Sequence, residues 1–457
     1  MKRPFIYMCL FLLAATLGFY FKSSLYLDPD LGWELRTGEL ILSQGFPRTD
    51  PFSYTMPKFP FVPHSWLSDI AFFITEQQFG FVGLTMLTSI ALTATLVAIL
   101  GLSWQSWTYL PALLLFAHFL PYAGVRPQTF SWLLFALFLR ILFDVKALAK
   151  YKKYFPLLFL FWAQVHGAVF IGLFALGIHA VIERKVGIFL LSVLATLINP
   201  YGIGLWREVF TTLTSLSTHA NVNEWAPIIS RLDYRLVIVF ALPLLFISRY
   251  WNSYSSLGKI LFFMLSGVML MSGKIFPFWL VLAGFIIVQG FEFFLKDIEQ
   301  NSPSKKGAKT RFSTLIYVLG IAVIVNSIIM SIATIQSYKP LSEERYYPKK
   351  AITYLKTNPP QGNIFAPFGW GGYLIWKLPE KRVFIDGRMP HWENILNEYS
   401  EIISLQSPFA KVAESYNINT VLVQKNRTNF VLLAKELQKN GWKKVYEDEV
   451  SLILIYR

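Results

Sequence analysis

Residues 27 to 69 hold side chains suited to acid–base chemistry, in a polar stretch between apolar segments. A carboxylate at the mouth of a helical bundle can take a proton from an attacking hydroxyl group. Because one apolar segment precedes the stretch and many follow it, we expect a large first loop at residues 21–80, outside the membrane. Its candidate site residues are Asp28, Asp30, Glu34, Asp50 and His64.

A second group of polar residues falls at junctions between apolar segments on the same predicted side: Arg126, His166, Asn199, Glu224 and Lys274. Ionisable residues near membrane depth are costly and usually face a cavity or a partner. Cationic side chains there could stabilise the charge that develops on a departing phosphate. Each also has a plainer explanation, such as a snorkelling Arg or Lys, a histidine bonded to a carbonyl, or a solvated glutamate. Their joint placement on one side favours a site.

The composition is that of a membrane protein. Of 457 residues, 54% are hydrophobic and 15% charged, and the mean hydropathy is +0.46. The net charge of +15 does not indicate nucleic-acid binding, because the basic residues cluster in short loops, as the positive-inside rule predicts. The single cysteine, Cys9, excludes an intramolecular disulfide.

The order of apolar segments predicts about eleven transmembrane helices, with the N-terminus in the cytoplasm. Residues 4–20 form the first, an uncleaved anchor rather than a signal peptide. Residues 154–183 would make a helix of about 45 Å, too long for one span, so we split them at His166. The other spans are expected at 81–101, 106–124, 129–145, 186–200, 236–248, 258–272, 276–294 and 313–335.

The polar segments between these spans have different predicted roles. Residues 30–42 and 64–79 show helical spacing of apolar residues and are expected to form surface helices in the first loop. The basic segments 146–153 and 296–311 are expected to be cytoplasmic loops. The segment from residue 201 to about 235, which includes Asn221 and Asn223, is expected to be a polar outer loop.

The composition changes near residue 336, so we predict a transmembrane domain at 1–335 and an extracytoplasmic α/β domain at 336–457. Predicted strands lie at 362–366, 382–385, 420–424, 444–447 and 451–456, and predicted helices at 349–356, 392–405 and 430–439. Asp386 and Arg388 follow the second strand, where binding residues are common in α/β domains. The alternative is a buried Asp–Arg pair. Aromatic residues among glycines could form a docking surface for sugar or membrane at Phe368–Trp376.

The layout of helix, large outer loop with surface helices, further spans and C-terminal domain resembles the GT-C superfamily of membrane glycosyltransferases. That superfamily includes protein O-mannosyltransferases and lipid A aminoarabinose transferases. Its members open the first loop with an Asp–Glu pair followed by a surface helix that ends at glycine. Residues 30–45 match in length, with Asp30 in the position of the catalytic aspartate. Leu31 stands where the neighbouring acid would be, which leaves Asp28 and Glu34 as substitutes.

The chain also resembles an uncharacterised bacterial branch of this superfamily, through motifs spread over nearly its whole length. These motifs are Asp28–Trp33, Thr37–Glu39, Asp50–Thr55, His64–Leu67, Val125–Gln128, Trp162–Gly167, Asn199–Gly202, Asn223–Trp225, Phe368–Trp376 and Val383–Arg388. The resemblance implies a multi-pass protein of the bacterial inner membrane.

The resemblance implies transfer of a sugar from a polyprenyl-phosphate carrier to a glycan, lipid or protein acceptor outside the cytoplasm. Asp30 would be the base, supported by Asp28 and Glu34. The donor phosphate would lie near Arg126, His166 and Lys274. Residues expected to shape the loop or hold the acceptor are Asp50, His64, Glu224, Asp386 and Arg388.

Two other classes of function remain open at this point. A transporter or flippase would use the same charges to bind a moving substrate, but it predicts an internal repeat, and we find none. A non-catalytic assembly protein would tolerate loss of the loop carboxylates. The sequence holds no nucleotide-binding loop, no H-E-x-x-H and no paired Cys or His ligands. No cofactor is certain, although the Asp28 and Asp30 pair permits a divalent cation.

Overall fold

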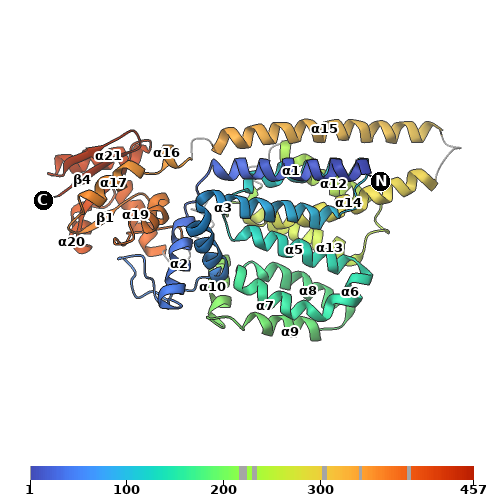
Figure 1. Cartoon of the computed structure of the whole chain (residues 1–457), viewed down its shortest axis with the longest axis horizontal. Helices are drawn as coiled ribbons and strands as arrows, with labels where there is room; N and C mark the ends of the chain where they lie inside the picture. Colours follow the sequence, from blue (N-terminus) through green and yellow to red (C-terminus); the bar gives the residue numbers. More distant parts are fainter. Residues whose placement is uncertain are drawn as a thin grey trace. The chain divides into compact units, whose positions relative to one another are not determined.

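A computed structural model describes residues 2–215, 224–228, 234–300, 306–338, 342–388 and 393–456 (Figure 1). The chain divides into two compact units. Unit 1 comprises Met1–Ser24, Thr85–Gly202 and His219–Ser337. Unit 2 comprises Leu25–Leu84, Ile203–Thr218 and Tyr338–Arg457.

Unit 1 is built from helices that correspond to the predicted apolar spans. They are α1 (Lys2–Ser24), the later part of α3 (Trp66–Leu100), α4 (Tyr109–Phe119), α5 (Gln128–Phe143), α7 (Phe155–Val165), α8 (Val169–Glu183), α9 (Gly187–Thr196), α12 (Tyr234–Arg249), α13 (Ser256–Met271), α14 (Phe276–Gln300) and α15 (Lys306–Tyr338). Helix α14 packs against α4, α5, α12 and α13, and its residue Trp279 is fully buried. The predicted polytopic helical fold is confirmed.

Two predicted breaks between helices are confirmed. Gly80 has φ 60° and ψ −160° within α3, so the helix predicted at 64–79 is interrupted before the span that follows it. These angles are readily accessible to glycine and strained for other residues. His166 has extended backbone angles at the end of α7, and α8 starts at Val169, which divides the long apolar stretch as predicted.

Among the described residues, four helices are long and apolar enough to cross a membrane: Phe5–Ser24, Trp66–Leu100, Gly273–Asp297 and Gly320–Tyr338. Five shorter apolar helices of 10–17 residues accompany them. At about 1.5 Å per residue these are shorter than a bilayer core of about 30 Å. The chain is therefore a multi-pass helical membrane protein, and the number of eleven crossings stays a prediction.

Three predicted loops were wrong in part. The basic segment 146–153 forms α6 (Val145–Tyr151) and a following 3-10 turn, η3 (Lys152–Tyr154), because the Asp144 side chain caps the helix by accepting from the Lys146 and Ala147 N–H groups. Most of the predicted linker 296–311 belongs to α14 and α15. The polar segment after residue 201 contains α10 (Gly204–Thr214), whereas Asn221 and Asn223 lie outside the described residues.

Unit 2 contains a mixed sheet, which in the described part of the chain has four strands in the order β1-β2-β4-β3. The strands are β1 (Asn363–Phe365), β2 (Ile418–Gln424), β3 (Lys443–Glu447) and β4 (Ser451–Ile455). β1 is parallel to β2, and the other neighbours are antiparallel. The helices are α2 (Leu31–Gln44), α10, α16 (Glu343–Tyr346), α17 (Lys349–Thr357), α18 (Gly371–Lys377), α19 (Glu393–Ile403), α20 (Phe409–Ser415) and α21 (Thr428–Lys439). The predicted α/β character of the C-terminal segment is confirmed, except at one strand.

Residues 382–385 were predicted as a strand, and this was wrong. Val383 instead forms an isolated bridge with Ser53 of the first loop. The Val383 N–H donates to the Phe52 carbonyl at 2.9 Å, and the Tyr54 N–H donates to the Val383 carbonyl at 3.1 Å. The backbone groups of this apolar segment therefore find their partners in the first loop rather than in the sheet.

Helix α2 of the first loop packs tightly against α18 of the C-terminal segment within unit 2. A methyl group added at Gly32 would lie 1.8 Å from the Gly372 carbonyl oxygen, and one added at Gly372 would lie 2.0 Å from the Pro29 carbonyl oxygen. The two glycines thus allow the backbones to touch. Trp370 and Tyr373 are buried at 0% and 3% exposure. The predicted aromatic docking surface was wrong at these two rings, which are core residues.

We expect Gly372→Ala to destabilise unit 2 by about 1–3 kcal/mol, because the methyl group has to push α2 away from α18. The measurement is the melting temperature of the purified protein in detergent. Gly267→Ala is the matched control, since nothing lies within 4 Å of a methyl group at that helical position. An equal melting temperature for both variants would contradict the close contact.

Candidate functional site

The acidic residues before α2 are held by local hydrogen bonds. The Asp28 carboxylate accepts from the Asp30 N–H at 3.0 Å, and Asp30 Oδ1 accepts from the Trp33 indole N–H at 3.2 Å. Asp28 is buried at 4% exposure and Asp30 is half-buried. Both stand at the N-terminal end of a 14-residue helix, whose dipole stabilises negative charge.

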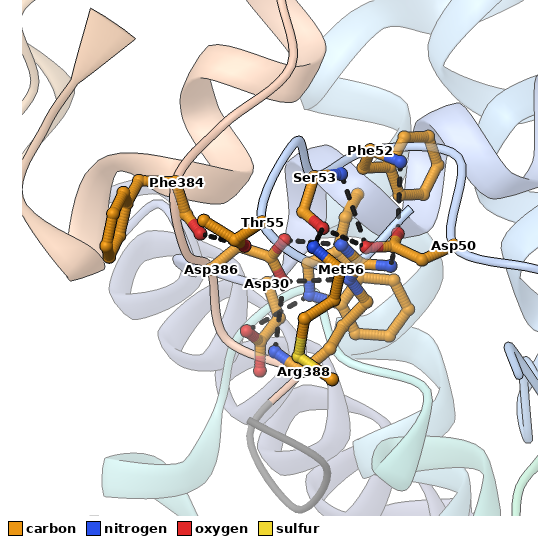
Figure 2. A network of polar contacts seen from close by, with 10 residues as sticks. Asp30, Asp50, Phe52, Ser53, Thr55, Met56, Phe384, Asp386 and Arg388 are labelled. Atoms are coloured by element: carbon orange, nitrogen blue, oxygen red, sulfur yellow. Dashed lines mark hydrogen bonds and ion pairs between the residues drawn. The ribbon is translucent and has the colours of Figure 1, made fainter. Parts of the chain in front are cut away.

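Asp30 also contacts the C-terminal segment. A methyl group added at Gly387 would lie 1.8 Å from Asp30 Oδ1, so the carboxylate occupies the space that any other side chain would need. Asp30 lies in one cluster with Asp50, Asp386 and Arg388 in Figure 2. The sequence motif around Gly387 therefore shapes the surroundings of the predicted base.

Arg388 lies between two buried carboxylates, Asp386 and Asp50 (Figure 2). Its Nε donates to Asp386 Oδ1 at 2.8 Å and its Nη2 to Asp386 Oδ2 at 2.5 Å. Its Nη1 donates to Asp50 Oδ1 at 2.6 Å. The side chains of Arg388, Asp50 and Asp386 are 8%, 3% and 0% exposed.

The same cluster fixes the first loop. Asp50 also accepts from the Phe52 N–H at 3.0 Å and from the Ser53 N–H at 3.3 Å. The guanidinium carbon of Arg388 lies 4.9 Å from the centre of the Phe52 ring and 5.0 Å from that of Phe61. Burial alone would lower the pKa of Arg388, but the two carboxylates raise it above its usual value, so the side chain stays charged. Asp50, Asp386 and Arg388 are thus engaged with one another.

Two further predicted residues of the loop lie in unit 2. Glu34 sits in the first turn of α2 and is buried at 5% exposure. His64 is half-buried and stands two residues before the start of α3. Ser65, which follows it, donates from its hydroxyl group to Asp69 Oδ1 at 2.9 Å, a contact that spans the first turn of α3. His64 therefore lies where the chain enters this helix.

In unit 1, the structure brings Arg126, Glu224 and Lys274 together. Arg126 Nη1 lies 2.5 Å from Glu224 Oε1, and Lys274 Nζ lies 3.4 Å from Glu224 Oε2. The Lys274 ammonium also lies 5.5 Å from the centre of the Trp225 ring. Arg126 precedes α5, and Lys274 lies in η5 (Gly273–Ile275) directly before α14, so helix ends position both cations.

Glu224 is ionised at any ordinary pH. Burial raises the pKa of its carboxyl group, but the charges of Arg126 and Lys274 and their hydrogen bonds outweigh this and lower it to about 2. Because the pKa is below the ordinary 4.5, the stability that these ion pairs contribute is present above that pH and is lost as the pH falls towards 2. At neutral pH the cluster carries one negative and two positive charges.

His166 belongs to a different network in unit 1. Its Nδ1 lies 3.2 Å from the Ser131 hydroxyl and accepts from the Ala168 N–H at 3.1 Å. The Trp162 indole N–H donates to the same hydroxyl at 2.8 Å. These contacts join α5, α7 and the start of α8, and His166 is 7% exposed.

Sequence reasoning missed Lys22. It lies near the end of α1, is 1% exposed, and donates from its ammonium group to the Ala123 carbonyl. Ala123 is three residues before Arg126, so Lys22 anchors the connection that carries that cation. Its position directly after an apolar run is typical of a solvated lysine at a helix end. No signal in the sequence distinguishes such a lysine from a buried one.

Within the part of the chain that the structure describes, no three His, Cys, Asp or Glu side chains gather so that they could hold a metal ion. Asp28 and Asp30 are connected by a hydrogen bond from the Asp30 main-chain N–H to the Asp28 carboxylate.

The fold is similar to that of ArnT from Cupriavidus metallidurans in its crystal structure bound to undecaprenyl phosphate. The TM-score is 0.50 at 11% identity, over 98% of this chain and 97% of that chain. ArnT in the apo state aligns over the same shares, with a TM-score of 0.48 and 11% identity. No protein-family model matches the sequence, and no curated protein matches it. ArnT is an aminoarabinose transferase of the GT-C superfamily, so the resemblance predicted from the sequence is confirmed at the level of the fold.

We expect Arg388→Ala to destabilise the protein by about 3–5 kcal/mol, because it leaves two buried carboxylates without their shared cation. Arg388→Lys keeps the charge but loses the paired donors to Asp386, so it should lose less stability than Arg388→Ala. The melting temperature in detergent measures both. Arg427→Ala, at an exposed arginine, is the control and should change little. If Arg388→Ala has the same melting temperature as Arg427→Ala, the cluster does not support the fold.

Proposed function

We propose that this chain is a membrane glycosyltransferase that moves a sugar from a polyprenyl-phosphate carrier to an acceptor outside the cytoplasm. The observation that carries the proposal is the fold similarity to ArnT over nearly the whole chain, since ArnT was crystallised with undecaprenyl phosphate. The acceptor is a hydroxyl-bearing glycan, lipid or protein. In this proposal the protein is a multi-pass protein of the bacterial inner membrane, with its N-terminus in the cytoplasm and its C-terminal segment outside.

Asp30 is our candidate for the base. As the acceptor oxygen bonds to the anomeric carbon of the sugar, its proton passes to the Asp30 carboxylate. The bond between the anomeric carbon and the carrier phosphate breaks, and the lipid phosphate leaves with the bonding electron pair. The half-buried position of Asp30, with Asp28 and Glu34 beside it at the start of α2, supports this role.

Arg126 and Lys274 are our candidates for binding the carrier phosphate. A guanidinium and an ammonium group that share one anion in unit 1 form an electropositive pair, which suits a phosphate whose negative charge grows as the sugar leaves. His166 is a positioning residue, because its contacts with Ser131 and Ala168 hold the junction between α7 and α8. Asp50, Asp386 and Arg388 shape the first loop, and His64 is assigned to the acceptor side.

We expect Asp30→Asn to reduce sugar transfer by about a hundredfold or more, with carrier binding retained, because the amide has the same shape but cannot take a proton. The assay is turnover of a panel of polyprenyl-phosphate sugars by purified protein in lipid nanodiscs. Asp297→Asn is the matched control, since Asp297 forms a surface ion pair with Arg249 at 3.2 Å. Full activity of Asp30→Asn would reject this base, and transport without transfer would favour a flippase.

We expect Arg126→Ala and Lys274→Ala each to weaken binding of undecaprenyl phosphate by about tenfold or more, because a hydrogen bond to a charged group contributes about 1.5–3 kcal/mol. Binding is measured by titration of the lipid into nanodiscs. Lys259→Ala, which removes a half-buried lysine that donates to the Trp251 carbonyl, serves as the control. Unchanged affinity in both site variants would exclude this cluster as the phosphate site.

A further inference from the structure

The Glu224 carboxylate divides its two oxygen atoms between two cations of different kinds. Oε1 faces the Arg126 guanidinium at 2.5 Å and Oε2 faces the Lys274 ammonium at 3.4 Å. The phosphate of a polyprenyl-phosphate sugar has two non-bridging oxygen atoms, which can bind Arg and Lys in the same manner, each on a separate donor. The carboxylate therefore occupies the position that two phosphate oxygen atoms would take on these cations.

The Glu224 side chain is partly exposed to water. It is 40% exposed, compared with 21% for Arg126 and 29% for Lys274. Water can therefore solvate the carboxylate when it leaves the two cations, which reduces the cost of breaking these ion pairs. The two carboxylates that pair with Arg388 differ in this respect, because Asp386 and Asp50 are 0% and 3% exposed.

The main chain beside Glu224 is fixed independently of its side chain. The Gly273 N–H donates to the Ala226 carbonyl at 3.1 Å. A methyl group added at Gly273 would lie 3.0 Å from the Glu224 carbonyl oxygen, so the two segments are in close contact. Rotation of the Glu224 side chain would therefore leave Lys274 and residues 224–226 beside each other.

We propose that Glu224 is an internal substitute for the donor phosphate, which pairs with Arg126 and Lys274 until the phosphate of the carrier lipid displaces it. The inference rests on the proposed function, because the displacing group is the carrier phosphate. Two anions cannot share these cations without strong repulsion, so one leaves when the other binds. The return of Glu224 after transfer would expel the lipid phosphate product, a step that limits the rate of many enzymes.

The test is titration of undecaprenyl phosphate into the full-length protein in nanodiscs of zwitterionic lipid. We expect Glu224→Gln to bind this lipid about tenfold more tightly than the wild type, because the amide does not compete for the cations. Glu224→Asp keeps the charge and should not gain affinity. Glu183→Gln makes the same chemical change at an exposed site at the end of α8 and should match the wild type. Inorganic phosphate in place of the lipid tests whether the headgroup alone suffices.

The outcomes separate the inference from the proposed function. Tighter binding in Glu224→Gln, lost again in the double variant with Arg126→Gln, supports displacement. Equal or weaker binding in Glu224→Gln overturns the inference, while the effect of Arg126→Gln on its own still reports on the phosphate site. If neither the wild type nor any variant prefers undecaprenyl phosphate over undecaprenol, the proposed function fails. A gain in Glu224→Asp equal to that in Glu224→Gln also overturns the inference, because the charge is then irrelevant.

Discussion

The fold of unit 2 depends on one buried cation. Arg388 neutralises Asp386, which is two positions away, and Asp50, which is 338 positions away. Burying either carboxylate without a partner would be strongly unfavourable, so the first loop and the C-terminal segment gain stability only when they are folded together. Asp50 then organises its own loop through the Phe52 and Ser53 N–H groups. An electrostatic requirement thus ties together two parts of the chain that sequence analysis treats as separate.

The same contact explains why glycine recurs in the C-terminal motifs. Once Arg388 fixes the loop, α2 lies against α18 with Gly32 and Gly372 in backbone contact, and Gly387 lies against the Asp30 carboxylate. These glycines provide space at a contact, where a side chain would force the backbones apart. The position of the candidate base is therefore set by residues more than three hundred positions later in the chain.

Sequence analysis predicted the helices well because apolar runs and their breaks are local signals. Gly80 and His166 marked two breaks that the structure also has. It failed at residues 382–385, where Val383 and its apolar neighbours have a strong preference for strands, because their hydrogen-bond partners come from the first loop and not from the sheet. The pairing of Arg388 with Asp50 was not predicted either, because Asp50 also lies in the first loop, far from Arg388 in the sequence. Lys22 was missed because burial of a helix end depends on the neighbouring helices.

The Arg388 and Glu224 ion clusters differ in how much water reaches them, and this difference decides what each can do. The side chains of Arg388, Asp50 and Asp386 are at most 8% exposed, so exchanging a partner among them would leave a charge unsolvated, and these three residues serve as a fixed support. Around Glu224 the charged side chains are 21–40% exposed, so water can solvate a released carboxylate while another anion takes its place. A binding site for a charged lipid needs this second kind of cluster. Its cations must bind one anion and still be accessible to a second anion that replaces it.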